Sequence, residues 1–258
     1  GTVGDLKMAV QRSLGRPFLR LAAADGRILN PTESLQSAGV ENGSCIAAIA
    51  QQPKIAATQS AFALWCAGGD RIVTWGKSDS GGDSTAVQDQ LRNVEQVHAT
   101  NTAFAAILSN ETVVTWGNPY SGGNSTAVQD QLRDVQQVHA TNFAFAAILS
   151  DGTVVTWGHS DLGGDSSAVQ DQLRNVQQVH ATHSAFAAVL SDGTVVTWGH
   201  SASGGDSTAV QDQLRNVQQV HATNSAFAAI LSDGTVVTWG DPDCGGDSTA
   251  VQEQLIGL

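Results

Sequence analysis

The sequence predicts a mainly β protein. We expect a β-propeller of five three-stranded, 41-residue blades, closed or part of a larger ring, preceded by a small α+β domain. The first observation is a tandem repeat, in which Thr-Trp-Gly recurs every 41 residues with its tryptophans at Trp75, Trp116, Trp157, Trp198 and Trp239. The second is that each copy holds three short β-type runs, too few to bury both faces alone. Copies must therefore stack, and hairpin-rich units favour radial stacking over a linear solenoid.

Composition changes near Gln51-Gln52-Pro53-Lys54, which predicts two domains, 1–52 and 53–258. Residues 1–55 carry six basic and four acidic side chains, whereas residues 56–258 carry six basic and twenty acidic ones. The formal net charge of −12 argues against a general nucleic-acid binder and against docking to anionic lipid. No apolar run approaches the length of about 18 residues that would span a membrane.

Cys45, Cys66 and Cys244 form no CxxC pair, so neither a disulfide framework nor a cysteine-based zinc site is predicted. We expect no cofactor. The compartment stays open, with an intracellular one slightly favoured.

In the first domain, Thr2-Val3-Gly4-Asp5 has capping-box spacing. Leu6, Val10 and Leu14 follow at helical spacing, and Gly15 is a good helix stop. We then expect a strand over 18–23, a turn at Asp25-Gly26 and a last strand over 44–50.

This segment resembles a ubiquitin-like domain from its helix onward, on the strength of Leu6-Lys7, Val10, Asp25-Gly26-Arg27 and the 35–40 stretch. The resemblance implies an opening β-hairpin that is missing here, so we expect an upstream segment. The family's C-terminal Gly-Gly is replaced by Ala50-Gln51-Gln52-Pro53, which argues against conjugation. Arg20 stands in the region of the family's apolar recognition patch.

The repeat is clearest in its last copy. An inner strand is predicted over 219–223, a middle strand over 226–231 and an outer strand over 235–239, with a Ser-Asp-Gly turn between the last two. The first inner strand is predicted over 55–58. After each Trp-Gly, a Gly-Gly pair precedes a Thr or Ser that stands three residues before a Gln, as in Thr85 and Gln88. This capping-box spacing predicts a helix of one or two turns, and a trailing linker covers 244–258.

The hairpin sequence Phe-Ala-Ala-Ile-Leu-Ser-Asp-Gly-Thr-Val-Val-Thr-Trp-Gly resembles the regulator-of-chromosome-condensation repeat. In blade size it is closest to the propeller-type β-lactamase inhibitor proteins. The resemblance covers 54–258 and departs after the Trp-Gly, where Gly-Gly-Asp-Ser-Thr replaces the family's Gly-Gln-Leu-Gly. It implies recognition of a protein partner. Such families usually close larger rings, which leaves the closure of five blades open.

Three repeated features could carry chemistry. His98, His139, His180 and His221 recur on the inner strand, and could form a metal or proton-relay ring or be polar residues of the propeller interior. Ala56 breaks the series and no second ligand type accompanies it, so no metal site is predicted. The Gly-Gly-Asp-Ser run could cradle a phosphate, but its Asp would repel an anion and its oxygen suits a cap. That oxygen belongs to Asp83, Asn124, Asp165, Asp206 and Asp247.

No Gly-x-Ser-x-Gly elbow is present, and nearly every polar residue comes in multiples, whereas a catalytic centre needs one special site. We therefore predict that the chain is not an enzyme. The repeated tryptophans are interpreted as packing between blades.

The copies differ mainly in two stretches, one between the inner and middle strands and one after Trp-Gly. Tracing the strands puts both on one face, which we expect to bind partners, although drift in solvated loops would give the same pattern. Tyr120, Phe143 and Leu162 are the expected apolar anchors. The predicted partner-binding residues are Lys77, Asp79, Asn101, Asn118, Tyr120, Asn142, Phe143, His159, Leu162, His183, His200, Asn224, Asp241 and Asp243.

The sequence thus favours a non-catalytic protein–protein interaction module with one or more protein partners of unknown identity. One alternative is a structural or accessory subunit of a large assembly. Another is an adaptor fragment linked to ubiquitin signalling, since such repeats accompany ligase domains in some large proteins. Guanine-nucleotide exchange has no support beyond the shared repeats.

Overall fold

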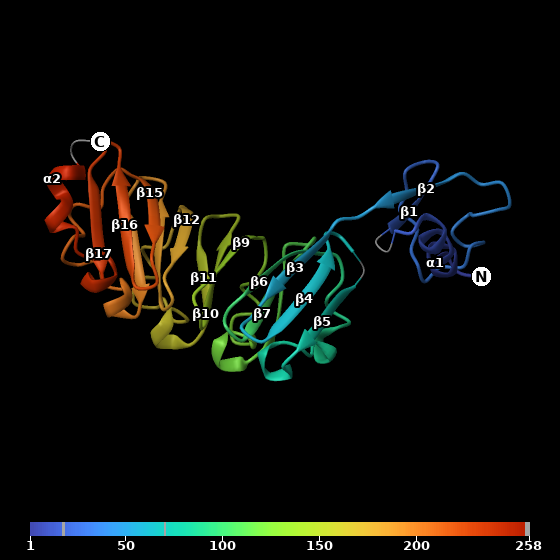
Figure 1. Ribbon diagram of the computed structural model, residues 1–258, viewed down its shortest axis with the longest axis horizontal. Helices are drawn as coiled ribbons and strands as arrows, with labels where there is room; N and C mark the ends of the chain where they lie inside the picture. The colour runs from blue at the N-terminus through green and yellow to red at the C-terminus, as the bar shows by residue number, and fades with distance from the viewer. Residues whose placement is uncertain (17–18, 70, 256–258) are drawn as a thin grey trace. The chain divides into compact units, whose positions relative to one another are not determined.

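The fold, seen in a computed structural model, is mainly β and propeller-like (Figure 1). The structure describes residues 1–16, 19–69 and 71–255. These residues form six antiparallel sheets, of which five are three-stranded and repeat along the chain, and one is two-stranded. They divide into two compact units, residues 1–54 with 65–67 and residues 55–64 with 68–258. Of the helices described, none has the length and apolar character needed to cross a bilayer.

The first unit contains helix α1 (Val3–Leu14) and strands β1 (Leu19–Ala23) and β2 (Ile46–Ala50), which pair antiparallel. The predicted capping box is confirmed, because the Thr2 side chain accepts from the Asp5 N–H and the Asp5 carboxylate accepts from the Thr2 N–H. Gly15 ends the helix at φ 62°. The resemblance to a ubiquitin-like domain stays a prediction, as does the domain boundary at residue 52.

The repeated sheets are numbered 1 to 5 in chain order, and each runs inner, middle, outer. The strands are β3 (Pro53–Ala57), β4 (Ala61–Cys66) and β5 (Ile72–Gly76); β6 (Val94–Ala99), β7 (Ala103–Leu108) and β8 (Val113–Gly117); β9 (Val135–Ala140), β10 (Ala144–Leu149) and β11 (Val154–Gly158); β12 (Val176–Ala181), β13 (Ala185–Leu190) and β14 (Val195–Gly199); β15 (Val217–Ala222), β16 (Ala226–Leu231) and β17 (Val236–Gly240). The inner strands β6, β9, β12 and β15 contact one another in succession. The predicted three-strand repeat is therefore confirmed, whereas ring closure stays open.

The Ser-Asp-Gly turn makes the predicted hairpin between middle and outer strands. In sheet 3, Gly152 adopts φ 77°, which a side chain would strain. Asp151 Oδ1 accepts from the Thr153 N–H at 2.9 Å and from its hydroxyl at 2.7 Å. This local bonding fixes the register of β10 against β11.

The core lies between neighbouring sheets. Phe145 and Trp157 of sheet 3 stack with ring centroids 5.2 Å apart and are almost fully buried. They pack against Ala103, Ala105 and other apolar residues of sheet 2. The Trp157 Nε1–H also donates to the carbonyl oxygen of Gly122, which precedes sheet 3, at 3.0 Å. The tryptophans of sheets 2 to 5 are thus packing residues, as the sequence predicted, whereas Trp75 of sheet 1 is 43% exposed.

The predicted linker helix is wrong for most repeats. Sheet 1 is followed by single 3-10 turns, η1 (Ser78–Ser80) and η2 (Thr85–Val87), and a short helix forms only after sheet 5, as η7 (Thr249–Val251) and α2 (Gln252–Leu255). The other 3-10 turns are η3 (Pro119–Ser121), η4 (Ser160–Leu162), η5 (Ser201–Ser203) and η6 (Pro242–Cys244).

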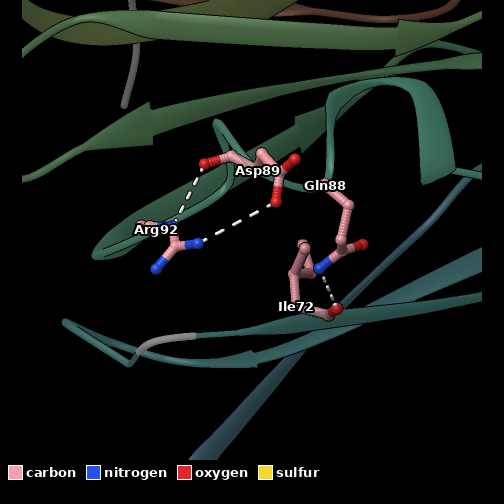
Figure 2. Close-up of polar contacts among 4 residues, drawn as sticks. All are labelled: Ile72, Gln88, Asp89 and Arg92. Atoms are coloured by element: carbon pink, nitrogen blue, oxygen red, sulfur yellow. Dashed lines mark hydrogen bonds and ion pairs between the residues drawn. The ribbon is translucent and has the colours of Figure 1, made fainter. Parts of the chain in front are cut away.

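The glutamine side chain of the expected capping box takes a different partner from the predicted one. Gln88 does not return to the backbone at Thr85. Instead its Nε2 donates to the carbonyl of Ile72 on β5 at 3.2 Å (Figure 2). Its Oε1 accepts from the Ser84 hydroxyl at 3.0 Å. The glutamine therefore ties the linker to the outer strand. Figure 2 also shows Arg92 beside Asp89, a pair that is exposed and contributes little.

Candidate protein-binding face

The two variable loops of each repeat meet at one edge of its sheet. In sheet 2 the Asn118 N–H donates to the Thr102 carbonyl at 2.9 Å, and the Thr102 hydroxyl donates to the Ser121 hydroxyl at 2.9 Å. The same main-chain bond joins His159 to Phe143 and Asp241 to Ser225. We call the resulting surface the loop face. It comprises residues 59–60 and 77–80, 101–102 and 118–121, 142–143 and 159–162, 183–184 and 200–203, and 224–225 and 241–244.

A main-chain ladder connects the loops of successive sheets. The N–H of Gln59 donates to the carbonyl of Asn101, Asn101 to Asn142, Asn142 to His183, and His183 to Asn224, all at 2.9–3.0 Å. Because only backbone atoms take part, the side chains at these positions can change without loss of the ladder. Sequence reasoning missed this structural role, since a backbone bond leaves no residue preference to detect.

The predicted binding residues divide into two groups by exposure. Exposed residues are Lys77, Asp79, Tyr120, His159, His200, Asn224 and Asp243. Half-buried residues are Asn101, Asn118, Asn142, Phe143, Leu162, His183 and Asp241. Two of the second group also stabilise their own 3-10 turns, because the Asn118 side chain accepts from the Tyr120 N–H and the Asp241 side chain accepts from the Asp243 N–H.

Tyr120 is the most prominent side chain of the loop face. It is 81% exposed, the highest value among the large apolar and aromatic residues described. Its backbone is held between Pro119, which fixes one torsion, and the Asn118 side-chain bond of 2.9 Å. A ring presented on a rigid turn loses little conformational freedom when it is bound. Phe143 and Leu162, the other expected anchors, are half-buried.

Charge is unevenly spread over the loop face. Sheet 1 contributes Lys77 and Asp79, and the acidic residues of the other loops are Asp161, Asp241 and Asp243. The His183 imidazole is held by Nδ1 contacts to the Asn224 carbonyl and to the Ser225 hydroxyl. Next to the loop of sheet 3 lies an open hollow of about 290 Å³ lined by residues that include Asp161, Asp165, Thr197 and Trp198. The acidic rim of this hollow favours a positively charged ligand group.

The repeated histidines lie along the inner strands. The Nε2 atoms of His98, His139 and His180 lie 3.1–3.3 Å from the Oε1 of the glutamine two residues earlier. Burial lowers the pKa of His98 and His180, and burial together with the two neighbouring histidines lowers the pKa of His139 to about 4. These imidazoles are therefore neutral at neutral pH. Within the described residues, no three His, Cys, Asp or Glu side chains converge to hold a metal ion.

The Asp or Asn after each Gly-Gly pair closes a local turn, and the predicted helix cap is wrong because the N-cap of η2 is Ser84, whose side chain makes no cap bond. Asp83 Oδ1 accepts from the Thr85 N–H at 2.9 Å and from its hydroxyl, and Asn124 Oδ1 accepts from the Thr126 N–H at 3.0 Å. The bonds from Thr85 lower the pKa of the Asp83 carboxyl. The acceptor oxygen that the two residue types share explains why Asn can replace Asp here.

No family model matches the sequence, and no curated protein matches it. Similar solved structures include human WBSCR16, at 15% identity and a TM-score of 0.47, over 76% of this chain and 65% of that one. Prp20p of Saccharomyces cerevisiae, studied with its binding to Gsp1p and histones, is similar at 16% identity and a TM-score of 0.48, over 86% and 66%. The CRINKLY WD40 ectodomain of the Arabidopsis thaliana receptor kinase ACR4 is similar at 15% and 0.46, over 74% and 64%. The chain thus spans just under two thirds of the length of these structures, and such likeness assigns it no partner.

Proposed function

We propose that this chain is a non-catalytic protein-interaction module that binds a protein partner through the loop face. The observation that supports this proposal most directly is the 81% exposure of Tyr120, on a turn held by Pro119 and Asn118. A large aromatic ring that is this exposed is typical of a binding anchor, and tyrosine is enriched among interface hot spots.

In each repeat, the side chains that hold the sheets together are separate from those that the loops expose, and this separation supports the proposal. The frame between sheets is held by side chains that are nearly the same in every copy, as in the Phe145–Trp157 pair. The loops are held by their main chain, so their side chains are free to differ. An array built in this way can change its binding surface without losing stability.

The charges of the loop face indicate the kind of partner. The loops after Trp-Gly carry Asp79, Asp161, Asp241 and Asp243 against Lys77. A partner with an apolar pocket for Tyr120 and basic side chains around it would complement this surface. Such charges mainly accelerate association and select the partner, and the buried ring supplies the affinity.

The test is site-specific photo-crosslinking with the full chain in cells of its source. A photoreactive phenylalanine analogue replaces Tyr120 in one variant and Asp192 in the other. Asp192 is an exposed residue of a Ser-Asp-Gly hairpin, at the opposite end of its sheet from the loop face. We expect a crosslinked protein from position 120 and none from position 192.

The purified crosslinked protein is then titrated with matched variants. Tyr120→Ala should weaken its binding by tenfold or more, since truncation of a hot spot costs about 2 kcal/mol or more. Asp192→Asn, which keeps the turn-capping oxygen, should leave the affinity unchanged. Crosslinks from position 192 alone would contradict the proposal and favour an accessory subunit packed through its other surfaces.

A further inference from the structure

The first sheet of the array has an exposed apolar face. Ile55 is 59% exposed, Phe62 44%, Val73 57% and Trp75 43%. The equivalent residues of sheet 3 are Val138, Phe145, Val155 and Trp157, whose exposures are 2%, 0%, 7% and 4%. With the half-buried Leu64, these residues of sheet 1 form what we call the first face. In sheets 3 to 5 the corresponding face is covered by the preceding sheet.

The last sheet has the opposite face uncovered. Ala228, Ile230 and Val236 of sheet 5 are half-buried, whereas Ala187 and Val195 at equivalent positions of sheet 4 are 0% and 1% exposed. The clearest marker is Gly245. A Cβ at this glycine would have no atom within 4 Å, but a Cβ at its equivalent Gly204 would meet the Phe227 ring at 2.5 Å.

Ala228, Ile230, Val236 and Gly245, with the half-buried Leu255, form the last face. The site where the Phe227 ring packs on Gly204 is therefore also present at Gly245, but no ring occupies it.

The same two faces end two series of hydrogen bonds. At each of the four internal junctions a tryptophan Nε1–H donates to the glycine carbonyl of the preceding repeat, at 3.0–3.1 Å. Trp75 is the next donor of this series and Gly245 the next acceptor, and the structure describes no partner for either atom. The main-chain ladder likewise ends with the Asn224 N–H on sheet 5 and the Gln59 carbonyl on sheet 1.

We propose that a second copy of this chain docks its first face on the last face of the first copy. Phe62 would pack on Gly245, the Trp75 Nε1–H would donate to the Gly245 carbonyl, and the Asn224 N–H would donate to the Gln59 carbonyl. Ile55, Val73 and Leu64 would cover Ala228, Ile230 and Val236. The contact continues an interface that the chain already forms four times, so its shape, apolar contacts and hydrogen bonds are known in advance.

The two faces differ from each other, so the contact is heterologous. Copies can then add head to tail until the rotation closes a ring, or continue as an open chain. Each copy carries a net charge of −12, and like charges repel at long range. Added salt screens this repulsion, so association should strengthen as the salt concentration rises.

The test measures the mass of the full chain by sedimentation velocity and native mass spectrometry. We expect a monomer of 26.7 kDa at high dilution and dimers or larger species when the concentration is raised about a hundredfold. Phe62→Glu with Trp75→Glu blocks the first face, and Ile230→Glu blocks the last face. Each variant alone should stay monomeric, and circular dichroism checks that both are folded. Leu255→Glu is a second variant of the last face, in the short terminal helix.

A mixture of the two blocked variants distinguishes this contact from other kinds of association. One partner keeps an intact last face and the other an intact first face, so the mixture should form a dimer and nothing larger. Met8→Glu, at an exposed apolar residue of α1, is the matched control and should associate as the unaltered chain does.

A chain that stays monomeric at every concentration, including one that closes on itself, would overturn the proposal. So would association that persists in both blocked variants.

Discussion

Sheets 1 and 3 contain the same aromatic pair in two different environments. Phe62 and Trp75 stack with centroids 5.3 Å apart at 25°, and Phe145 and Trp157 stack at 5.2 Å and 25°. The first pair is more than two fifths exposed, whereas the second is almost fully buried. The stack is therefore a property of one hairpin, set by the cross-strand register. Burial is a property of the array, because it needs a preceding sheet.

This contrast separates local from collective stability. In sheet 3 the aromatic pair buries its area against the Gly122 turn and the alanines of sheet 2, and Trp157 gains a hydrogen bond. In sheet 1 more than two fifths of each of these side chains still contacts water. A repeat thus depends on its neighbour for a large part of the free energy that its aromatic residues contribute.

The largest expected effect comes from truncating the aromatic ring in each environment. Phe145→Ala should lower the free energy of unfolding by about 3–5 kcal/mol, because it leaves a cavity between sheets 2 and 3. Phe62→Ala should lower it by less than about 1 kcal/mol, since an exposed ring leaves no cavity. The measurement is denaturant unfolding by circular dichroism at a dilution that keeps the chain monomeric. Equal losses from the two variants would contradict the distinction between sheets.

The glycine turns give a second matched pair. Gly122 and Gly245 have φ values of 92° and 98°, so an alanine is strained by the backbone at either position, by about 1–2 kcal/mol. At Gly122 the new Cβ would also meet the Phe145 ring at 2.5 Å, whereas at Gly245 it meets nothing.

Gly122→Ala should therefore cost about 1–3 kcal/mol more than Gly245→Ala, the range for overpacking a core. Thermal unfolding of both variants against the unaltered chain checks this difference. A smaller loss of thermal stability for Gly122→Ala than for Gly245→Ala would show that the junction between sheets 2 and 3 adjusts to the added methyl group.

The inner-strand histidines predict a pH dependence of the array. Burial and the neighbouring histidines lower the pKa of His139 from 6.5 to about 4, so the unfolded chain binds this proton more readily than the folded one. Stability is then complete above about pH 6.5 and falls as the pH drops toward 4. The aspartates with lowered pKa change the stability only below about pH 4, where the carboxyl groups of the unfolded chain take up protons.

The melting temperature should therefore decrease between pH 7 and pH 4.5, and His139→Gln should reduce that decrease. Measurement at pH 8, well above the lowered pKa of His139, isolates any effect of the substitution itself. A decrease of the same size in the variant would show that other groups set the pH dependence.

The elements that sequence reasoning predicted are those whose causes lie within a few residues. The hairpin follows from Asp151 and Gly152, and the α1 start follows from Thr2 and Asp5. The capping box was predicted wrongly, since Gln88 bonds a carbonyl sixteen residues away, a partner that spacing alone does not reveal.

The candidate site shows the same limit. The strand trace brings the two variable loops to one edge, but the main-chain ladder at Asn101 and Asn142 carries no residue signature. The exposure of Phe62 was equally hidden, since its sequence context resembles that of the buried Phe145 and only the neighbouring sheet differs.

The smallest expected effect concerns the hairpin of sheet 2, whose turn is Ser-Asn-Glu and not Ser-Asp-Gly. In sheet 2, Glu111 stands at the glycine position and adopts φ 61°, close to the 77° and 78° of Gly152 and Gly193. The turn keeps its other bonds, because the Asn110 side chain accepts from the Thr112 hydroxyl at 2.8 Å and the Glu111 carbonyl accepts from the Val135 N–H at 2.9 Å.

Glu111→Gly should therefore raise the free energy of unfolding by about 0.5–1 kcal/mol. The substitution relieves the left-handed strain, and this gain is partly offset by the greater freedom of glycine in the unfolded chain. The reverse change in an unstrained copy, Gly193→Glu, should lower stability, and a scan of both variants by denaturant unfolding compares them directly. A destabilised Glu111→Gly would mean that the glutamate side chain makes a contribution larger than the strain of its backbone.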